Sequence, residues 1–222
     1  MRDSRTEKWG PIAGIVFAVL FVAAFFVQGE LPSGDDSAAK VASFYDDSGN
    51  RAQVIIGTYM LFLASVLFLW FLGSLRRRLI EAEGEPGRLT PIAFGAGIVF
   101  IAMVMVGAAC FASIAGDIAF GEEKVATVAS GDAARVVPQL GYPVLLIGGM
   151  FAAIAMICAT SVLTMRTGVL PRWIGWYGFV AAVLLLAAVF FLPMILFVLW
   201  VLFVSIAMLR GAEAPAAPSP TQ

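Results

Sequence analysis

Six long apolar stretches run through this chain, and none of them contains an Asp, Glu, Lys, Arg or His residue. Their lengths bracket the roughly 20 residues that an α-helix needs to cross a bilayer. Strands are disfavoured, because the stretches show no two-residue alternation and an open sheet leaves backbone groups unpaired in lipid. We therefore expect an all-α fold: a polytopic membrane helix bundle with six transmembrane helices. The predicted spans cover residues 11–27, 52–75, 90–115, 139–165, 173–192 and 193–209.

Charged residues are few and are sorted between the two ends of the predicted spans. They make up 13% of the chain, against about 25% in a soluble domain. If the N-terminus is cytoplasmic, ten of the 14 Lys and Arg residues lie inside and nine of the 15 Asp and Glu residues lie outside. A basic inner side is typical of membrane proteins. We expect a multi-pass protein of the cell (cytoplasmic/inner) membrane, with the N-terminus and the C-terminus cytoplasmic.

The apolar part of the chain is expected to form one domain. Residues 1–210 would form a single six-helix transmembrane domain. Residues 211–222, rich in Ala and Pro, would form a disordered cytoplasmic tail because they lack large apolar side chains to pack. The first span has a second interpretation, since Arg2, Arg5 and Lys8 precede it as in a secretory signal peptide. No small-x-small cleavage pattern follows that span, which favours a retained helix.

Two longer connections lie on the predicted outer side, and each is expected to contain a short helix. In residues 28–51, Asp35 and Asp36 are candidate N-caps for a helix with one apolar face. That face consists of Val41, Phe44 and Tyr45. It either lies on the bilayer surface or caps the bundle. Residues 116–138 show the same pattern after Glu122, and together the two helices would form a lid.

Small residues are concentrated in the third and fourth predicted spans. Such residues let helix backbones approach closely, so we expect these spans to be neighbouring antiparallel helices. Alternatively, the space that they leave holds a lipid tail or a small ligand. Ser and Thr hydroxyls in these spans either line a weakly polar pocket or bond to carbonyls of their own helix. The candidate helix-packing or ligand-cavity residues are Gly107, Ala112, Ser113, Gly149, Ala153, Thr160 and Thr164.

Catalytic residues are not expected in this chain. A serine nucleophile needs a base, usually His, and the chain contains none. Ser113 and Asp117 are four residues apart on one helix but lack that third partner. Cys110 and Cys158 lie in apolar spans, where a thiol is usually a packing residue. We expect no enzyme activity, no cofactor, no metal site and no nucleic-acid partner.

Three adjacent arginines follow the second predicted span. Arg76, Arg77 and Arg78 are candidates for contact with anionic lipid headgroups at the inner face. The other explanation is that they only fix the topology. Trp200, by contrast, falls near the middle of the sixth predicted span. We expect its indole to face other helices and its N–H to need a hydrogen-bond partner.

Two segments of the chain are similar to each other. Residues 14–26 and 178–190 match at eight of 13 positions. Membrane transporters are often built from such repeats. The alternative is coincidence, because so few residue types make up an apolar span.

Three short motifs carry a resemblance to a known group of proteins. They are FYDDSGNR from Phe44, FLWFLGSLRRRL from Phe68 and RTGVLPRWIGWYG from Arg166. With these motifs the chain resembles the uncharacterised six-helix integral membrane proteins of high-GC bacteria. The resemblance implies a protein of the bacterial inner membrane without an assigned reaction, and it transfers no site residues.

Two function classes remain after these exclusions. In the first, the chain is a non-catalytic membrane component that binds lipid or a membrane partner, either another membrane protein or a second copy of itself. In the second, it is a facilitator or carrier of a neutral small molecule or lipid. The uncharged spans favour the first class, because ion-coupled transport usually needs an ionisable group at depth.

Overall fold

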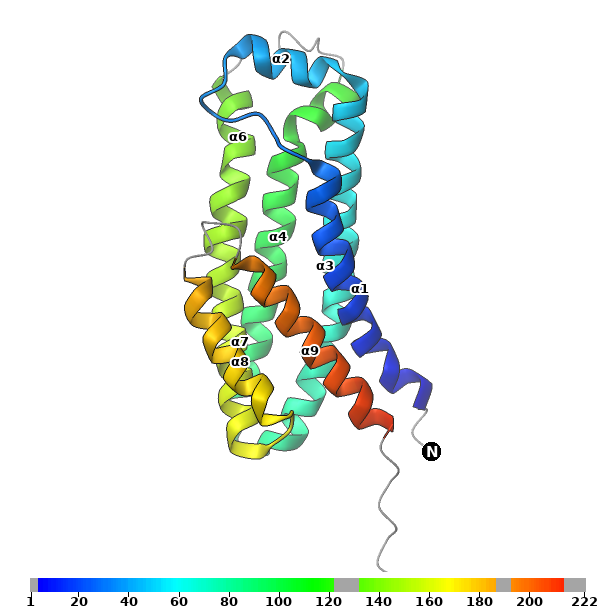
Figure 1. Cartoon of the computed structure of the whole chain (residues 1–222), viewed down its shortest axis with the longest axis vertical. Helices are drawn as coiled ribbons and strands as arrows, with labels where there is room; N and C mark the ends of the chain where they lie inside the picture. The colour runs from blue at the N-terminus through cyan, green and yellow to red at the C-terminus, as the bar shows by residue number, and fades with distance from the viewer. Residues whose placement is uncertain (1–3, 122–131, 187–192, 214–222) are drawn as a thin grey trace, which may run out of the picture.

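All regular structure that the computed structural model describes, in residues 4–121, 132–186 and 193–213, is helical. The helices are α1 (Ser4–Gln28), α2 (Ala38–Asp46), α3 (Ser48–Glu83), α4 (Leu89–Phe120), α6 (Asp132–Tyr142), the π-helical η1 (Pro143–Gly149), α7 (Met150–Thr167), α8 (Arg172–Leu185) and α9 (Met194–Glu213). α6, η1 and α7 follow one another without a break and form a single rod (Figure 1). The all-α class is therefore as predicted.

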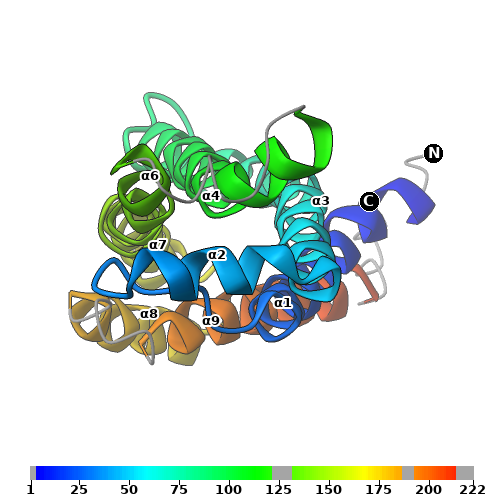
Figure 2. The ribbon, with the colours of Figure 1, turned by 90° about the horizontal axis from the view of Figure 1, so that it is seen from above.

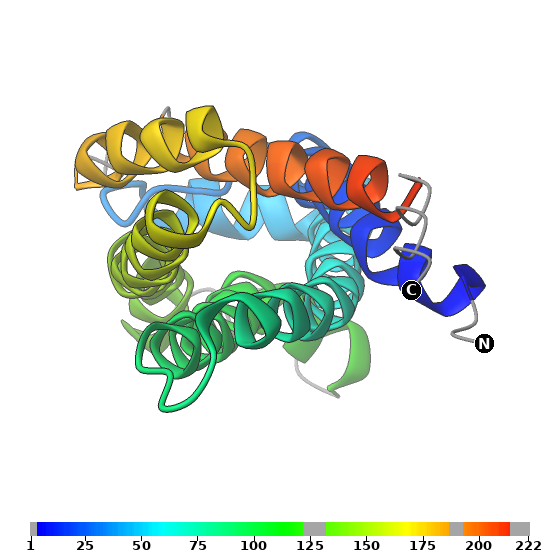
Figure 3. The same ribbon diagram turned by 90° about the horizontal axis from the view of Figure 1, so that it is seen from below.

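The rods close into a ring in which each one contacts the next. Its order is α1, α3, α4, the α6–η1–α7 rod, α8, α9 and back to α1. Seen from below, α8, α9 and α1 form one layer and α7, α4 and α3 form the other (Figure 3). Aromatic rings fill the space between the layers, because they bury large apolar areas in tilted and edge contacts. These rings belong to Phe17, Phe21, Phe68, Phe71, Phe100 and Phe197.

The prediction of six spans is met only in part, since five described helices are long and apolar enough to cross a membrane. The predicted fifth span forms α8, whose 14 residues give a length of about 21 Å. That length is below the roughly 30 Å of a hydrocarbon core. The predicted sixth span, residues 193–209, forms most of α9, which has 20 residues. α8 ends and α9 begins part-way along the bundle (Figure 1).

Both ends of the described chain lie at the same end of the molecule. α1 begins and α9 ends there, and α2 lies across the opposite end (Figures 1 and 2). The last turns of α3, with their three arginines, are at the end where α1 begins. Outward-facing side chains along the spans are large and apolar, as a surface in contact with lipid requires. They include Val19, Leu63, Val106 and Val183.

Several predicted helix boundaries were wrong. α1 begins at Ser4, seven residues before the predicted span, so Pro11 lies inside the helix. α4 begins at Leu89, where the Glu83 carboxylate accepts the first backbone N–H groups. α9 continues to Glu213, so the start of the predicted tail is helical. Residues 214–222 lie outside the described residues, and the disordered tail stays a prediction.

The helix predicted in the first outer connection is confirmed as α2. Its N-cap is Ser37, whose hydroxyl accepts the Lys40 N–H, and not Asp35 or Asp36. Val41 and Tyr45 of α2 are buried, and they pack in one apolar cluster with side chains of α3 and α4. α2 therefore caps the bundle and does not lie on the bilayer surface. The helix predicted after Glu122 falls outside the described residues.

Candidate functional site

An apolar cavity of about 550 Å³ lies between α1, α4, α6 and the first turns of α9. Ligand pockets in proteins typically have volumes of about 300–1,000 Å³. The lining residues are Val22, Phe25, Phe26, Gln28, Gly29, Glu30, Leu31, Phe111, Tyr142, Met194, Ile195 and Val198. We call this space the α1–α9 cavity.

The cavity exists because α9 begins part-way along the bundle. Met194, Ile195 and Val198 of its first turns line one end of the cavity. At the other end the chain leaves α1 at Gly29, whose φ of +66° favours glycine because other residues are strained there. That reversal carries residues 30–31 over the cavity. A helix that began nearer the α2 end would fill this space.

The α1–α9 cavity reaches the outer surface of the bundle. Phe26 of α1 and Ile195 of α9 both line it, yet they are 83% and 48% exposed. Both residues belong to apolar segments that are long enough to cross a membrane. The cavity therefore borders an apolar part of the protein surface.

Gln28, the last residue of α1, is the buried polar side chain of this cavity. It is 4% exposed, and its Nε2 has no hydrogen-bond partner among the described residues. A Cβ added at Gly57 of α3 would lie 2.8 Å from the Gln28 Cβ, so the two helices hold this residue tightly. A buried donor without a partner costs about 1–3 kcal/mol. An acceptor on a bound molecule would remove that cost.

A second, more polar space adjoins the first beneath α2. It has a volume of about 390 Å³ and is lined by Glu30, Leu31, Pro32, Asp36, Lys40, Ser43, Phe44 and Asn50. Glu30 and Leu31 line both spaces, so the two lie side by side there. We call this second space the α2 pocket.

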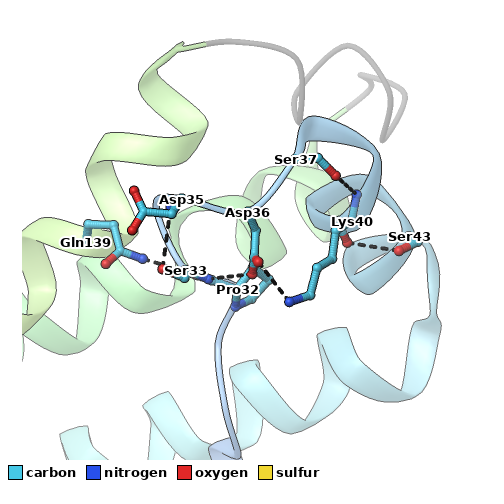
Figure 4. Close-up of polar contacts among 8 residues, drawn as sticks. All are labelled: Pro32, Ser33, Asp35, Asp36, Ser37, Lys40, Ser43 and Gln139. Atoms are coloured by element: carbon cyan, nitrogen blue, oxygen red, sulfur yellow. Dashed lines mark hydrogen bonds and ion pairs between the residues drawn. The ribbon is translucent and has the colours of Figure 1, made fainter.

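Hydrogen bonds hold the segment between α1 and α2 in place (Figure 4). The Gln139 side chain of α6 donates to the Pro32 carbonyl at 3.0 Å. The Asp36 carboxylate accepts the Ser33 N–H at 2.9 Å and pairs with the Lys40 ammonium at 2.8 Å. The hydrogen bonds from Lys40 and Ser33 hold the pKa of Asp36 below its ordinary value. The segment between α1 and α2, which covers the α1–α9 cavity, is thus held in place by α2 and α6.

The predicted cavity residues of α4 and of the α6–η1–α7 rod line neither of these two spaces. The two rods do pack side by side, as predicted. Gly107 is buried against Leu145 and the Gly141 carbonyl, and Gly149 faces Met103. Ala153 is also buried, and Ala112 is half-buried. The role of these residues in ligand binding stays a prediction.

The hydroxyls of the spans differ in their hydrogen bonding, and that of Thr58 on α3 donates to the Ala108 carbonyl of α4 at 3.5 Å. Those of Ser65 and Ser113 donate to carbonyls of their own helices at 2.8 Å, as one of the two interpretations predicts. Thr160 and Thr164 are buried, and their hydroxyls have no partner among the described residues. Ser161, beside them on α7, has an unpartnered hydroxyl as well.

Trp200 is fully buried among helices, as predicted, but its indole N–H lacks the expected partner among the described residues. It lies against Gly178 of α8, where an added Cβ would be 3.0 Å from Nε1 and 2.1 Å from the Ser161 hydroxyl oxygen. Gly14 of α1 also packs on α9, beside Ser205. The two similar segments thus both present a glycine to α9, and a true repeat stays a prediction.

The three arginines after the second span have contacts within the protein. Arg76 lies over the Phe94 ring, 5.1 Å from its centroid, and Arg77 is 3.7 Å from Glu81. The Arg78 guanidinium donates to the Met208 carbonyl of α9 at 2.5 Å. Arg76 and Arg77 are exposed, so they remain candidates for contact with lipid headgroups.

Sequence reasoning missed the cavity residues Gln28, Glu30, Phe111 and Tyr142. They come from three segments far apart in the chain. The space between them exists because α9 begins part-way along the bundle. One signal was present, since Gln28 and Glu30 are the first polar residues after the first apolar stretch.

No family model, characterised protein or solved structure matches this chain. The resemblance to six-helix bacterial membrane proteins therefore rests on its three motifs alone. The helices show a multi-pass helical membrane protein by length and composition. Within the described ranges, no three His, Cys, Asp or Glu side chains are grouped so that they could hold a metal ion.

Proposed function

We propose that this protein is a non-catalytic membrane component that binds a lipid or lipid-like molecule in the α1–α9 cavity. One observation carries the proposal. The cavity is apolar, it is lined in part by exposed apolar side chains, and its one buried amide, that of Gln28, has no partner among the described residues. The orientation with both termini in the cytoplasm is part of this proposal and rests on the distribution of Lys and Arg.

The energetics of such a site differ from those of a pocket in water. A lipid acyl chain that moves from the bilayer into the α1–α9 cavity exchanges one apolar environment for another, so the hydrophobic effect contributes little to its binding. Affinity must come from close packing and from polar contacts. Gln28 and Glu30 supply those contacts at the end of the cavity nearest α2.

The carrier of a neutral molecule is the second candidate, and it has less support. A carrier must move its cargo through the bundle. Beyond the floor of the α1–α9 cavity, the buried cluster around Phe68, Phe100 and Phe197 fills the ring. Transport would require these rings to separate, whereas binding requires no such change.

A matched pair of substitutions on α1 tests the proposal. Val22 lines the cavity, whereas Val19, one turn away, is exposed and does not. We expect wild type and Val19→Trp to carry one lipid-class molecule in native mass spectrometry after mild extraction. Val22→Trp places an indole in the opening and should lower its occupancy at least about tenfold, which corresponds to about 1.4 kcal/mol.

Two results would contradict the proposal. The first is a wild-type protein that carries no molecule of defined mass. The second is equal occupancy in Val22→Trp and Val19→Trp, because the bound molecule would then lie elsewhere. Thermal unfolding of both variants checks that each one is folded.

A further inference from the structure

We infer that the bound molecule is an acyl ester of a neutral polyol, with its chain in the α1–α9 cavity and its hydroxyl groups in the α2 pocket. This inference rests on the proposed function and specifies the ligand class. It follows from the way in which the two spaces are joined and from the charges at their junction.

The two spaces form one site with an apolar part and a polar part. Glu30 and Leu31 line both, so a molecule in the cavity can extend beneath α2 at this point. The cavity is enclosed mostly by aliphatic and aromatic side chains, whereas Asp36, Lys40 and Asn50 line the pocket. An amphipathic molecule matches this division, because each of its ends meets an environment of its own kind.

The charge of the α2 pocket disfavours an anionic headgroup. Lys40 is the cation of the pocket, and it already pairs with Asp36 at 2.8 Å (Figure 4). Glu30 has no ion pair or hydrogen bond among the described residues. The residues that line the α2 pocket therefore carry two carboxylates, those of Glu30 and Asp36, against the single ammonium of Lys40. A phosphate placed there would be repelled, and like charges across an interface exclude wrong partners.

The polar atoms at the junction define which groups the ligand must present. The Gln28 Nε2 is a buried donor that has no partner in the part of the chain that the structure describes, so an acceptor on the ligand would satisfy it. The Glu30 carboxylate only accepts, so it needs a donor. An ester carbonyl supplies the acceptor at the end of an acyl chain, and the hydroxyl groups of a polyol supply the donors. A monoacylglycerol carries both kinds of group in this order.

A pair of lipids that differ by one phosphate tests the inference. The probes are monooleoylglycerol and its 3-phosphate, titrated into the detergent-solubilised full-length protein and followed by native mass spectrometry. We expect wild type to bind monooleoylglycerol at least about tenfold more tightly than the phosphate. Glu30→Gln removes the carboxylate and should reduce this preference to about twofold or less. Asp35→Asn is the matched control, since Asp35 is exposed in the same segment and lines neither space.

The outcomes separate this inference from the proposed function. If neither lipid binds with saturation, the proposed function is wrong. If both bind equally, or the phosphate binds more tightly, the protein binds lipid but our inference of a neutral polyol headgroup is wrong. An unchanged preference in Glu30→Gln, or an equal loss in Asp35→Asn, would show that Glu30 does not select the headgroup.

Discussion

Glu83 joins two helices through its carboxylate. It is the last residue of α3, and its oxygens accept the backbone N–H groups of Arg88, Leu89 and Thr90 at 2.7–2.8 Å. These are donors that the first turn of α4 leaves unpaired. The apolar run of α3 ends at Leu75, so Glu83 lies outside the membrane-spanning segment. Its desolvation would raise its pKa, but the hydrogen bonds from Thr90, Leu89 and Arg88 outweigh this and lower the pKa to about 2.

Glu83→Gln should therefore destabilise the protein in a pH-dependent way. We expect the free energy of unfolding to fall by about 1 kcal/mol near neutral pH, as for loss of a helix cap. The folded-state pKa lies below the ordinary value of 4.5, so the ionised form favours the folded state. Its contribution is fully present above pH 4.5 and is lost as the pH falls towards 2.

Thermal unfolding of both proteins in detergent, measured by circular dichroism across this pH range, checks the expectation. Glu85→Gln is the control, since Glu85 is exposed in the same connection. A difference between wild type and Glu83→Gln that stays constant down to pH 2 would show that the charge has no part in the cap.

α4 and the α6–η1–α7 rod approach each other closely at two glycines, Gly107 and Gly141. A Cβ added at Gly141 would lie 2.8 Å from the Gly107 carbonyl oxygen and 2.6 Å from the Phe111 ring. Pro143 follows two residues later, at the start of η1. Proline has no N–H to donate to the carbonyl four residues earlier, and the wider π-helical turns begin there. Tyr142, between these two residues, lines the α1–α9 cavity.

Gly141→Ala should lower the stability of the bundle, whereas Gly149→Ala should not. At Gly141 the methyl group meets backbone, which cannot move aside, so the expected cost is about 1–3 kcal/mol. At Gly149 the nearest atom, the Met103 Cβ, would be 3.5 Å away, an ordinary contact. The substitution there should raise the free energy of unfolding by up to about 1 kcal/mol, because alanine has a higher helix propensity than glycine. Unfolding temperatures of the two variants in one detergent provide the measurement, and equal temperatures would count against a close approach at Gly141.

On the scale of the whole molecule, the basic and acidic connections lie at opposite ends of the ring. Ser43 is in α2, Glu85 is in the connection between α3 and α4, and Arg172 is the first residue of α8. That connection and the start of α8 lie at the end of the bundle opposite α2 (Figure 1). The distribution of Lys and Arg predicts that α2 faces away from the cytoplasm.

Cysteine labelling on intact cells tests this topology, in a background in which Cys110 and Cys158 are replaced by Ala. Ser43→Cys should react with a membrane-impermeant maleimide. Glu85→Cys and Arg172→Cys should react only after the cells are permeabilised. The reverse pattern would invert the orientation, and labelling of Ser43→Cys and Glu85→Cys from one side would show that α3 does not cross.

How far the sequence predicts this molecule depends on whether a feature is local or distant. Apolar runs bounded by charges correctly predicted α1, α3, α4 and the α6–η1–α7 rod, because hydropathy is local. The apolar face at Val41 and Tyr45 likewise predicted α2. Hydropathy did not reveal that α8 is short, since residues 172–209 are apolar throughout apart from Arg172. The α1–α9 cavity was missed for the same reason, because it depends on where α9 begins.

α8 and α3 stand on opposite sides of the ring. The apolar run of α3, residues 52–75, is about 36 Å long, whereas α8 is about 21 Å long. A bilayer around this protein thus meets a positive hydrophobic mismatch on one flank and a negative mismatch on the other. Lipids beside α8 must thin or tilt, and lipids beside α3 need not. The consequence is a difference in the required membrane thickness between two flanks of a single bundle.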